Sequence, residues 1–485
     1  MNASGRTVLF VLGVMLASLS AAMFAPAIAD LNDDAQAAHA FFGAGGLGLA
    51  LGGIMTLMGR GSTKDLSARG AILLTGGAWI VLSVAAAIPL KLSGLDISWT
   101  DALFEATSGI TTTGATVLTG LQDMPAGILL WRSILQWIGG VGIIVTAMAI
   151  WPLLGIGGMQ LFRLESSDNS EKALPRAGQI AAAVGLVYLV LTFLCFLAYL
   201  GAEMTPFEAI NHAMTTVATG GFSTHDGSIG AFVDGGADLV ALVFMVLAAL
   251  PFVLFLRAAQ GRPDLLVFDP QARAFLMVAL TASVLLTLWL VVHDPHDHGH
   301  LPAWRIAAVN GVSVLTGTGY ASVDFWLWGG GAAGIFFVLM FIGGCAGSTT
   351  CSVKIFRYQI AASAMNAYIA QYARPNAVKP IRYRNQTVPD ETVRSVLGFF
   401  FLFFLTFGIS ASILSLIGLD PVTAVSGAAT TLANVGPGLG EIIGPAGSFQ
   451  GLPAPAKWVM TANMIIGRLE IMVIFVMLAP RFWRG

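Results

Sequence analysis

The stretch Thr111–Thr116, which reads TTTGAT, decides the fold because it is the clearest of four related runs. The other three runs are Ala218–Ser223 (ATGGFS), Thr316–Ala321 (TGTGYA) and Ala433–Gly438 (ANVGPG). The fourth position is glycine in every run, and the steps between these glycines are 107, 98 and 117 residues. The four glycines are Gly114, Gly221, Gly319 and Gly436. This spacing predicts a fourfold internal repeat of roughly one hundred residues.

The composition is that of a polytopic membrane protein. Of the 485 residues, 56% are apolar and only 10% are charged, whereas about a quarter of the residues in a soluble domain are charged. The three cysteines make an odd count without a paired spacing, so no disulfide framework is expected. The net charge of −2 gives no reason to expect a nucleic acid as partner.

Ten apolar segments are expected to cross the bilayer, which requires about 20 helical residues per crossing. They lie at about 7–29, 39–58, 71–90, 127–153, 177–200, 237–256, 274–293, 332–342 with a continuation, 395–417 and 457–479. The first segment has an alternative, because Ala25–Ala29 could mimic a signal-peptide cleavage site. Its apolar run is longer than the roughly 7 to 15 residues usual for a signal peptide, so we expect a retained helix.

Lysine and arginine residues fall mainly on one predicted face of the membrane, which holds 19 of the 24. The remaining five are Lys91, Arg132, Arg305, Lys457 and Arg468. Cytoplasmic loops carry an excess of basic residues. We therefore expect both termini in the cytoplasm and all four glycine runs towards the outer side.

Each glycine run follows a helical segment too short to cross the bilayer. Thr205-Pro206 and Asp420-Pro421 each offer an N-cap followed by proline, and each cap precedes its glycine by 16 residues. The carbonyl ends of such short helices would point into the membrane, where the helix dipole favours a cation. Glycine permits the backbone angles that turn successive carbonyls to one side, as a cation-selective filter requires. We therefore expect four loops of one chain to converge on a cation path.

With these four runs in order, each in a helix–loop–helix repeat, the sequence resembles the Trk/Ktr/HKT superfamily of potassium transporters. The extra helix pair before the first repeat, and the ending Gly467–Glu470 to Pro480–Trp483, are most similar to the TrkH family, the membrane subunits of bacterial Trk potassium uptake systems. The resemblance implies potassium uptake across the bacterial inner membrane, with rubidium also permeant and without an organic cofactor. The potassium-binding residues expected in the filter are Thr112, Thr113, Gly114, Thr219, Gly220, Gly221, Gly317, Thr318, Gly319, Asn434, Val435 and Gly436.

The expected fold is an all-α polytopic membrane protein with fourfold pseudo-symmetry. An N-terminal transmembrane helix pair (residues 1–70) precedes four units of helix, pore helix, filter loop and helix. These units are residues 71–176, 177–273, 274–392 and 393–485. Only the central glycine is common to the four loops, so the carbonyl cage should be less symmetric than a channel filter. Pro437 has no N–H, so its loop cannot be held from behind like the others.

The second span of the third repeat is interrupted by Gly343–Ser352, which holds three glycines and a Ser/Thr cluster. Each glycine costs a helix about 1 kcal/mol relative to alanine, so the helix should break here. The family resemblance implies that this segment is an intramembrane gate beneath the filter, and the alternative is a tight helix contact built from small residues. The expected gate residues are Gly343, Gly344, Gly347, Ser348, Thr349 and Arg468.

Arg468 lies near the middle of the last predicted span. A charge at this depth normally faces an aqueous cavity or a partner. The family carries an arginine near its gate loop, which implies that Arg468 raises the barrier to potassium or hydrogen-bonds the loop. The alternative is a salt bridge with a carboxylate of a neighbouring helix.

Two groups of polar residues allow more than one interpretation. His293, His296, His298 and His300 could suggest a metal site, but they lack a helical ligand spacing and a solvated loop is expected. Five carboxylates near the outer mouth could either concentrate cations or cap helices and pin loops. They are Asp101, Glu105, Glu208, Asp226 and Asp324.

The resemblance also implies partners. The predicted cytoplasmic loop 354–394 holds seven basic residues, and in the family such faces rest on nucleotide-binding regulatory subunits (TrkA-like), with the membrane subunit as a homodimer. No nucleotide-binding motif and no catalytic constellation is found in the sequence. Two alternatives remain: an ion-coupled secondary transporter of a small solute, and a potassium symporter coupled to sodium or protons.

Overall fold

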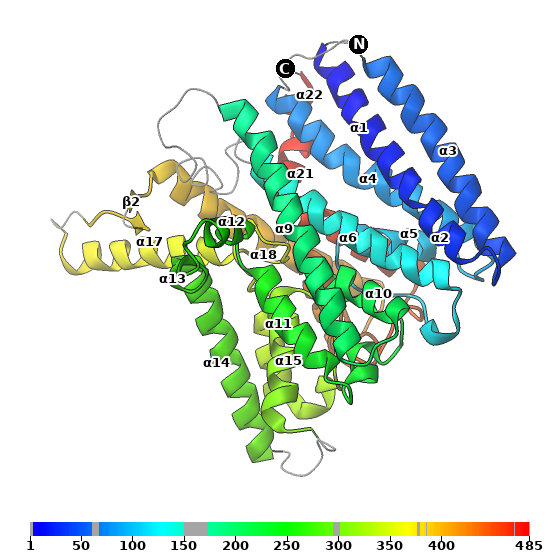
Figure 1. Ribbon diagram of the computed structural model, residues 1–485. Coiled ribbons are helices and arrows are strands. Elements are labelled where there is room, and N and C mark those ends of the chain that lie inside the picture. The colour runs from blue at the N-terminus through cyan, green and yellow to red at the C-terminus, as the bar shows by residue number, and fades with distance from the viewer. Residues whose placement is uncertain are drawn as a thin grey trace.

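The computed structural model describes residues 3–60, 67–149, 173–293, 301–375, 379–384, 386–469 and 471–484. These residues are almost entirely helical (Figure 1). The α-helices are α1 (Ala3–Ala22), α2 (Phe24–Ala29), α3 (Ala35–Gly59), α4 (Ala68–Leu92), α5 (Trp99–Ile110), α6 (Ala126–Ala149), α9 (Ala173–Gly201), α10 (Pro206–Val217), α11 (Ala237–Ala249), α12 (Phe252–Ala259), α13 (Leu265–Phe268), α14 (Pro270–His293), α15 (Ala303–Thr316), α16 (Gly329–Met340), α17 (Ile355–Ala373), α18 (Asp390–Leu416), α19 (Pro421–Ala433), α20 (Ala454–Arg468), α21 (Ile471–Leu478) and α22 (Pro480–Arg484). The 3-10 helices are η1 (Leu121–Asp123), η2 (Ser228–Phe232) and η3 (Phe325–Trp328), and the antiparallel strands are β1 (Arg382–Tyr383) and β2 (Gln386–Thr387).

Within the described residues, seven helices are long and apolar enough to cross a membrane, and two bent helix pairs would raise the number to nine. The seven are Gly5–Ala29, Ala35–Gly59, Arg69–Leu92, Ala126–Ile143, Ala182–Gly201, Pro270–His293 and Asp390–Leu416. The eighth predicted span, at 332–342, corresponds to α16, whose 12 residues are too few to cross alone. The predicted all-α membrane fold is confirmed, whereas this eighth crossing is not a continuous helix.

The N-terminal helices α1 and α3 pack closely because glycines line their contact. A Cβ atom placed on Gly13, Gly52 or Gly59 would lie only 2.6 to 2.7 Å from a backbone nitrogen of the opposite helix. Small residues allow membrane helices to approach in this way without a water-driven hydrophobic effect. The predicted extra helix pair before the first repeat is therefore one tightly packed unit.

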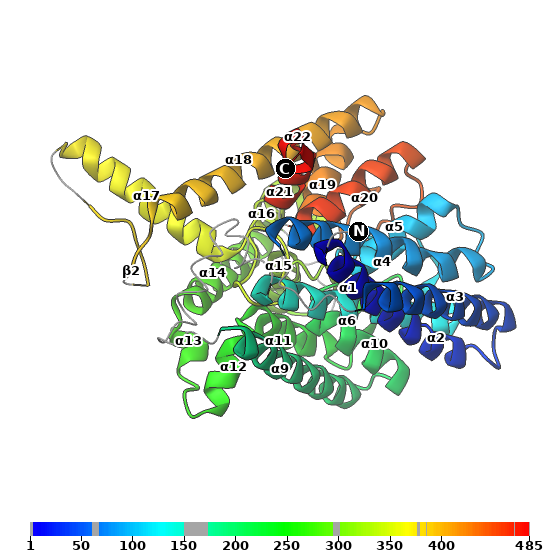
Figure 2. The same ribbon diagram turned by 90° about the horizontal axis from the view of Figure 1, so that it is seen from above.

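Four short helices, α5, α10, α15 and α19, stand where re-entrant segments were predicted, and they hold 12, 12, 14 and 13 residues. Thr205 and Asp420 cap α10 and α19 through backbone N–H groups, with proline in the first turn, as predicted. Ser98 and Asp101 form a capping box on α5. Viewed from above, the four repeats follow one another around the centre of the molecule (Figure 2).

The predicted span over residues 237–256 is a bent pair of helices and not one straight helix. Helix α11 ends at Ala249, α12 begins at Phe252, and the two axes differ by 90°. Pro251 accounts for the break, because it lacks an N–H group and its ring clashes with the preceding turn. The last predicted span, residues 457–479, is likewise divided into α20 and α21.

A third departure from straight helices lies between α16 and α17, where the helix breaks as predicted. Residues 341–354 separate the two helices and contain the glycine and Ser/Thr cluster. Helix α17 and the β1–β2 hairpin then extend to one side of the helical bundle (Figure 2). The two chain ends lie close together at one end of the molecule (Figure 1).

Candidate functional site

The loops at residues 111–116, 218–223, 316–321 and 433–438, named the filter loops, share one backbone conformation. Each has two left-handed residues separated by one residue. The first of each pair is Thr112 (φ 53°), Thr219 (φ 51°), Gly317 (φ 70°) or Asn434 (φ 53°), and the second is Gly114 (φ 85°), Gly221 (φ 76°), Gly319 (φ 79°) or Gly436 (φ 110°). All twelve predicted filter residues therefore lie at equivalent positions in four loops that repeat one geometry.

Each filter loop is tied to its own pore helix by the same hydrogen bond. The residue before the central glycine donates its N–H to the carbonyl oxygen five positions earlier. The four bonds join Thr113 to Ser108 (2.8 Å), Gly220 to Thr215 (2.9 Å), Thr318 to Ser313 (2.9 Å) and Val435 to Thr430 (2.9 Å). This is the 6→1 bond that terminates many helices. It turns the chain sharply at the carbonyl end of each pore helix.

The central glycines and their neighbours form a closed ring. A Cβ atom on each glycine would come within 3.0 Å of the carbonyl oxygen that precedes the glycine of the next loop. Gly114 faces the Gly220 oxygen, Gly221 faces the Thr318 oxygen, Gly319 faces the Val435 oxygen, and Gly436 faces the Thr113 oxygen. The contacts thus run from loop one to two, three, four and back to one. No side chain fits at any of these four positions.

A cavity of about 220 Å³ lies against this ring, and all four central glycines line it. Its other walls include Arg132, His225 and Asp226. Since the glycines expose only backbone here, backbone polar groups are available to a small dehydrated ion at the cavity floor. The carbonyl ends of four pore helices converge on the same point, which favours a cation over an anion.

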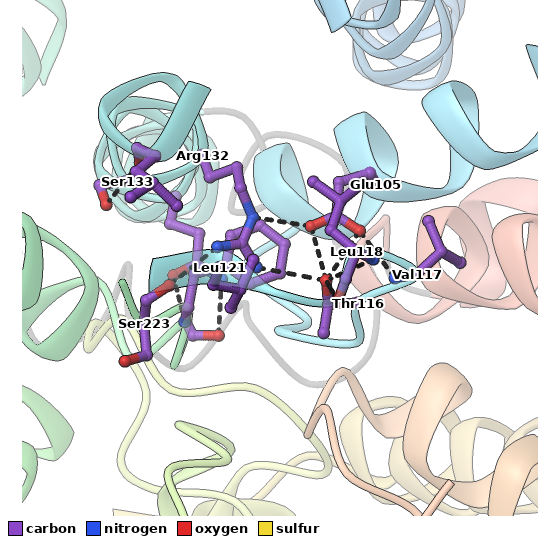
Figure 3. Close-up of polar contacts among 12 residues, drawn as sticks. Glu105, Thr116, Val117, Leu118, Leu121, Arg132, Ser133 and Ser223 are labelled. Carbon is purple, nitrogen blue, oxygen red and sulfur yellow. Dashed lines mark hydrogen bonds and ion pairs between the residues drawn. The ribbon is translucent and has the colours of Figure 1, made fainter. Parts of the chain in front are cut away.

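A buried ion pair braces the first two filter loops from behind (Figure 3). Arg132 on α6 donates from Nε to Glu105 Oε1 (2.8 Å) and from Nη1 to the Ser223 carbonyl (2.8 Å). Glu105 also accepts from Thr116 Oγ1 (2.9 Å) and from the Val117 N–H (2.9 Å). The Glu105 and Arg132 side chains are 0% and 2% exposed. Sequence reasoning placed Arg132 only at the outer face or within the membrane and did not assign it this partner.

Glu105 has counterparts in the other repeats that sequence reasoning missed. It lies nine residues before its central glycine, and so do His212 and Asn310. His212 Nε2 contacts Ser223 Oγ (2.9 Å), and Asn310 Nδ2 donates to Ser322 Oγ (2.8 Å). A polar residue at one fixed offset from three of the four central glycines was the signal that could have revealed them.

The fourth repeat departs from this pattern, because Gly427 stands nine residues before Gly436. Ser426 takes over the role: its hydroxyl accepts from the Leu439 N–H (3.0 Å). The loop is held further by a bond from the Gly438 N–H to the Ile443 carbonyl (2.7 Å). In the fourth repeat the Ser426 side chain therefore holds the filter loop. In the other three repeats a polar residue one position later in the pore helix does so.

Gln136 makes the second filter loop unlike the others. Its amide nitrogen donates to the Gly220 carbonyl (2.6 Å), and its amide oxygen accepts from the Phe222 N–H (3.0 Å). The Gly220 oxygen is one of the four that form the ring. This shared carbonyl agrees with the expected loss of strict fourfold symmetry.

The five carboxylates predicted near the outer mouth all cap helices or pin loops. Glu105 is the buried brace, Asp101 and Glu208 belong to capping boxes, Asp226 accepts from two N–H groups at residues 120–121, and Asp324 caps η3. Asp101 also pairs with Lys457 (2.6 Å), and Glu208 contacts His225 (3.2 Å). Of the two interpretations, the structure supports pinning.

The segment 343–352, named the gate loop, lies directly against the filter loops. Cys351 Sγ is 3.5 Å from Thr112 Oγ1, and the Ser352 N–H donates to the Ala433 carbonyl (3.0 Å). A Cβ atom on Gly317 would be 3.0 Å from Cys351 Cβ. The contacted residues precede the central glycines, whereas the cavity is lined by the central glycines and by residues that follow them.

The predicted gate residues occupy different parts of this loop. Gly343 and Gly344 pack against the returning chain, where a Cβ atom would meet backbone or side-chain atoms within 3.0 Å. Gly347 is left-handed (φ 73°) with open space around it. Ser348 Oγ donates to the Cys345 carbonyl (2.6 Å), and Thr349 Oγ1 donates to Ala248 (3.2 Å).

Arg468 touches the gate loop and is buried, with 3% of its surface exposed. Its Nη1 donates to Cys351 Sγ (3.0 Å) and its Nη2 donates to the Gly139 carbonyl (3.5 Å). Among the described residues no carboxylate pairs with it. The salt-bridge alternative is therefore not supported in the described part of the chain, and Arg468 carries a fixed charge next to the gate loop.

The histidine-rich segment contributes no metal site that the structure describes. His296, His298 and His300 lie outside the described residues, and the ring of His293 stacks on Trp289 with centroids 3.7 Å apart. Among the described residues no group of three or more potential metal-binding side chains comes together.

Known proteins share this sequence and this fold. The TrkH family, described as cation transport proteins, matches residues 39–484. The chain is 46% identical to the Trk system potassium uptake protein TrkI of Halomonas elongata over 85% of this chain and 83% of that protein. It is 38% identical to TrkH of the same organism, and 99% of each chain is covered.

A solved structure is also similar over its full length. The crystal structure of the potassium transporter TrkH from Vibrio parahaemolyticus matches with a TM-score of 0.90 and 35% identity, covering 99% of both chains. Identity of this extent over whole chains, together with four equivalent loops closed into one ring, assigns the protein to a family of transporters rather than enzymes. The chain belongs to the TrkH family of cation transport proteins.

Proposed function

We propose that the chain is the membrane subunit of a Trk potassium uptake system and conducts potassium through the four filter loops. Curated relatives that match over 99% of both chains are named potassium uptake proteins. The ion is the transported substrate. It would bind at the predicted filter residues Thr112, Thr113, Gly114, Thr219, Gly220, Gly221, Gly317, Thr318, Gly319, Asn434, Val435 and Gly436.

The observation that carries the proposal is the closed ring of central glycines. Each glycine abuts a carbonyl oxygen of the next loop, so the positions of the four carbonyls are fixed relative to one another. A potassium ion must exchange its hydration water for such oxygens, and it does so only where they are already in place. The four pore-helix dipoles add a favourable negative potential.

The gate loop with Arg468 would control the inner end of this path. It lies beside Thr112, Gly317 and Ala433 of three filter loops, so potassium could leave the filter only after the loop moves. The charge of Arg468, placed against Cys351, would oppose a cation in the same space and hold the loop closed. A polar, glycine-containing loop can move without dismantling packed helices.

Partners and location follow from the same proposal. Helix α17 and the β1–β2 hairpin project from the bundle (Figure 2) within the basic segment 354–394, which suits a cytoplasmic regulatory subunit that binds nucleotides (TrkA-like). The protein would act as a homodimer in the bacterial inner membrane with both termini cytoplasmic. Rubidium, close to potassium in size, would also pass.

Flux into proteoliposomes tests the proposal. Potassium, rubidium and sodium uptake are compared for the intact chain, for Gly319→Ser and for deletion of Gly344–Cys351. We expect Gly319→Ser to lose the preference for potassium, because its side chain would collide with the Val435 carbonyl. We expect the deletion to leak. Unchanged selectivity in Gly319→Ser would overturn the filter assignment, and the absence of a leak would overturn the gate.

A further inference from the structure

The gate loop is also held from α14, on a side of the loop away from the filter. The Ala346 N–H donates to Gln271 Oε1 (3.0 Å), and Gln271 is 1% exposed in the first turn of α14. Its Nε2 atom is buried without a hydrogen-bond partner among the described residues. A buried amide donor without an acceptor is unfavourable. It is therefore available to bind a different gate-loop carbonyl when the loop moves.

One carboxylate connects Gln271 to the hairpin. Asp269 caps α14, since its Oδ1 accepts from the N–H of Gln271 (2.9 Å) and of Ala272 (3.3 Å). Its Oδ2 pairs with Arg384 Nη2 (2.5 Å), and the two side chains are 8% and 22% exposed. The same side chain therefore holds the backbone of Gln271 and the guanidinium of a residue directly after β1.

The hairpin is in turn fixed to α17. Ser363 Oγ donates to the Arg382 carbonyl (3.0 Å) and accepts from the Arg382 N–H (3.2 Å). Helix α17 follows the gate loop directly, and the Ile355 N–H at its start donates to the Gly344 carbonyl (3.1 Å). The hairpin and α17 are thus connected to the gate loop in two ways. One connection is covalent, since α17 follows the loop in sequence, and the other is non-covalent, through Asp269 and Gln271.

We infer that Gln271 is a positioning residue for the gate loop and that the Asp269–Arg384 ion pair transmits movement of the hairpin to it. The inference rests on the proposed gate and names how it is regulated. A partner that displaces the hairpin relative to α14 would strain the ion pair, turn the first residues of α14 and withdraw the Gln271 oxygen from Ala346. The loop would then lose its hold at Ala346 while its bonds to the filter remain.

A purely structural role is the alternative, since Asp269 also caps a helix. Asp269→Asn separates the two roles, because asparagine caps helices as well as aspartate but cannot form the ion pair. Gln271→Glu retains the acceptor oxygen for Ala346, whereas Gln271→Ala removes it. Arg262→Gln is the matched control: it breaks an exposed ion pair with Asp264 (3.1 Å) on the adjacent segment, which no described contact joins to the gate loop.

Rubidium uptake by full-length variants in proteoliposomes tests the inference, with the rubidium-to-sodium ratio and the melting temperature measured alongside. We expect Gln271→Ala to raise basal uptake about five- to tenfold, the effect of one hydrogen bond, and Gln271→Glu to remain near the intact chain. Asp269→Asn and Arg384→Gln should each raise uptake about threefold, as fits a partly exposed pair. Uptake by the double variant should be little higher than uptake by either single variant, because both substitutions break the same ion pair. The cation ratio should not change.

The outcomes separate the link from the gate. One outcome is that the deletion of Gly344–Cys351 leaks while Gln271→Ala, Asp269→Asn, Arg384→Gln and the double variant all show the same uptake as Arg262→Gln. In that case the proposed gate is supported and the link through Asp269 and Gln271 is refuted. A lower melting temperature without higher uptake would mean a structural role only, which also refutes it. Equal uptake by Gln271→Ala and Gln271→Glu would show that the side-chain oxygen of Gln271 does not position the gate loop. If the deletion itself does not leak, the proposed gate fails first.

Discussion

The filter loops and the gate loop both depend on glycine, but their surroundings differ. In the filter every central glycine has a left-handed φ and abuts a carbonyl of the next loop, so each loop is fixed by its neighbours. In the gate loop Gly347 is left-handed with no atom within 4 Å of its added Cβ. The contacts between filter loops join four equivalent loops in a closed ring. The gate loop is instead held by separate hydrogen bonds to several helices that are not equivalent. One arrangement resists movement, and the other can lose its contacts one at a time.

The largest expected effect on cation selectivity comes from closing the space at the tightest filter contact. In Gly221→Ala the methyl group would overlap the Thr318 carbonyl, a backbone atom that cannot turn aside. We expect potassium-over-sodium preference to fall roughly tenfold or more, which corresponds to about 1.4 kcal/mol. Gly120→Ala is the control, because Gly120 is also left-handed (φ 72°) but has open space around it. Equal loss in both variants would show that backbone strain, not the ring contact, matters.

The next effect concerns the brace behind the filter. Glu105→Gln leaves the Arg132 charge buried without its partner, and breaking such a pair typically costs about 3–5 kcal/mol. We expect a clear fall in the thermal unfolding midpoint, and partial recovery when Arg132→Met is added. Glu441→Gln, at an exposed position, serves as control. An unchanged midpoint in Glu105→Gln would contradict a stabilising brace.

A smaller effect is expected at the contact between the gate loop and Arg468. Cys351→Ala removes the sulfur that accepts from Arg468 (3.0 Å) and that approaches Thr112. Loss of one hydrogen bond, about 1 kcal/mol, should raise rubidium uptake severalfold without altering the cation ratio. Cys345→Ala is the matched variant, since Cys345 is buried in the same loop and only its backbone makes a described hydrogen bond to a helix. If both variants conduct alike, the Arg468 contact does not hold the loop.

The smallest effect is expected at the outer mouth. Asp226 accepts from the N–H groups of Gly120 (2.7 Å) and Leu121 (3.1 Å). Asp226→Asn keeps one acceptor oxygen, so we expect at most about 1 kcal/mol of stability to be lost and little change in the potassium concentration for half-maximal uptake. A marked shift in that concentration at low ionic strength would instead indicate electrostatic attraction of cations.

The sequence allowed the fold to be predicted where a pattern repeats. Four glycines at similar steps, with N-caps at Thr205 and Asp420, predicted the pore helices and the loops that follow them. The break at residues 343–352 was predicted from glycine content. These features are local, so the chain near each residue determines them.

Contacts between distant segments were not predictable in the same way. The pairing of Glu105 with Arg132 joins two helices, and neither residue has a neighbour in sequence that reveals the other. The bend at Pro251 was missed because the flanking residues are uniformly apolar and only the proline marks the break. The bond from Ala346 to Gln271 spans 75 positions and depends on how two repeats pack.

The broken helix α11–α12 and the gate loop complete one another. The Cys345 N–H donates to the Ala249 carbonyl, and the Phe252 N–H donates to the Gly347 carbonyl, both at 3.0 Å. If the gate loop moves as proposed, these four groups lose their partners at membrane depth, where lipid offers none. Water would then have to enter with the movement and hydrogen-bond with these groups. Solutes that are too large to enter and that lower water activity should accordingly favour the closed protein.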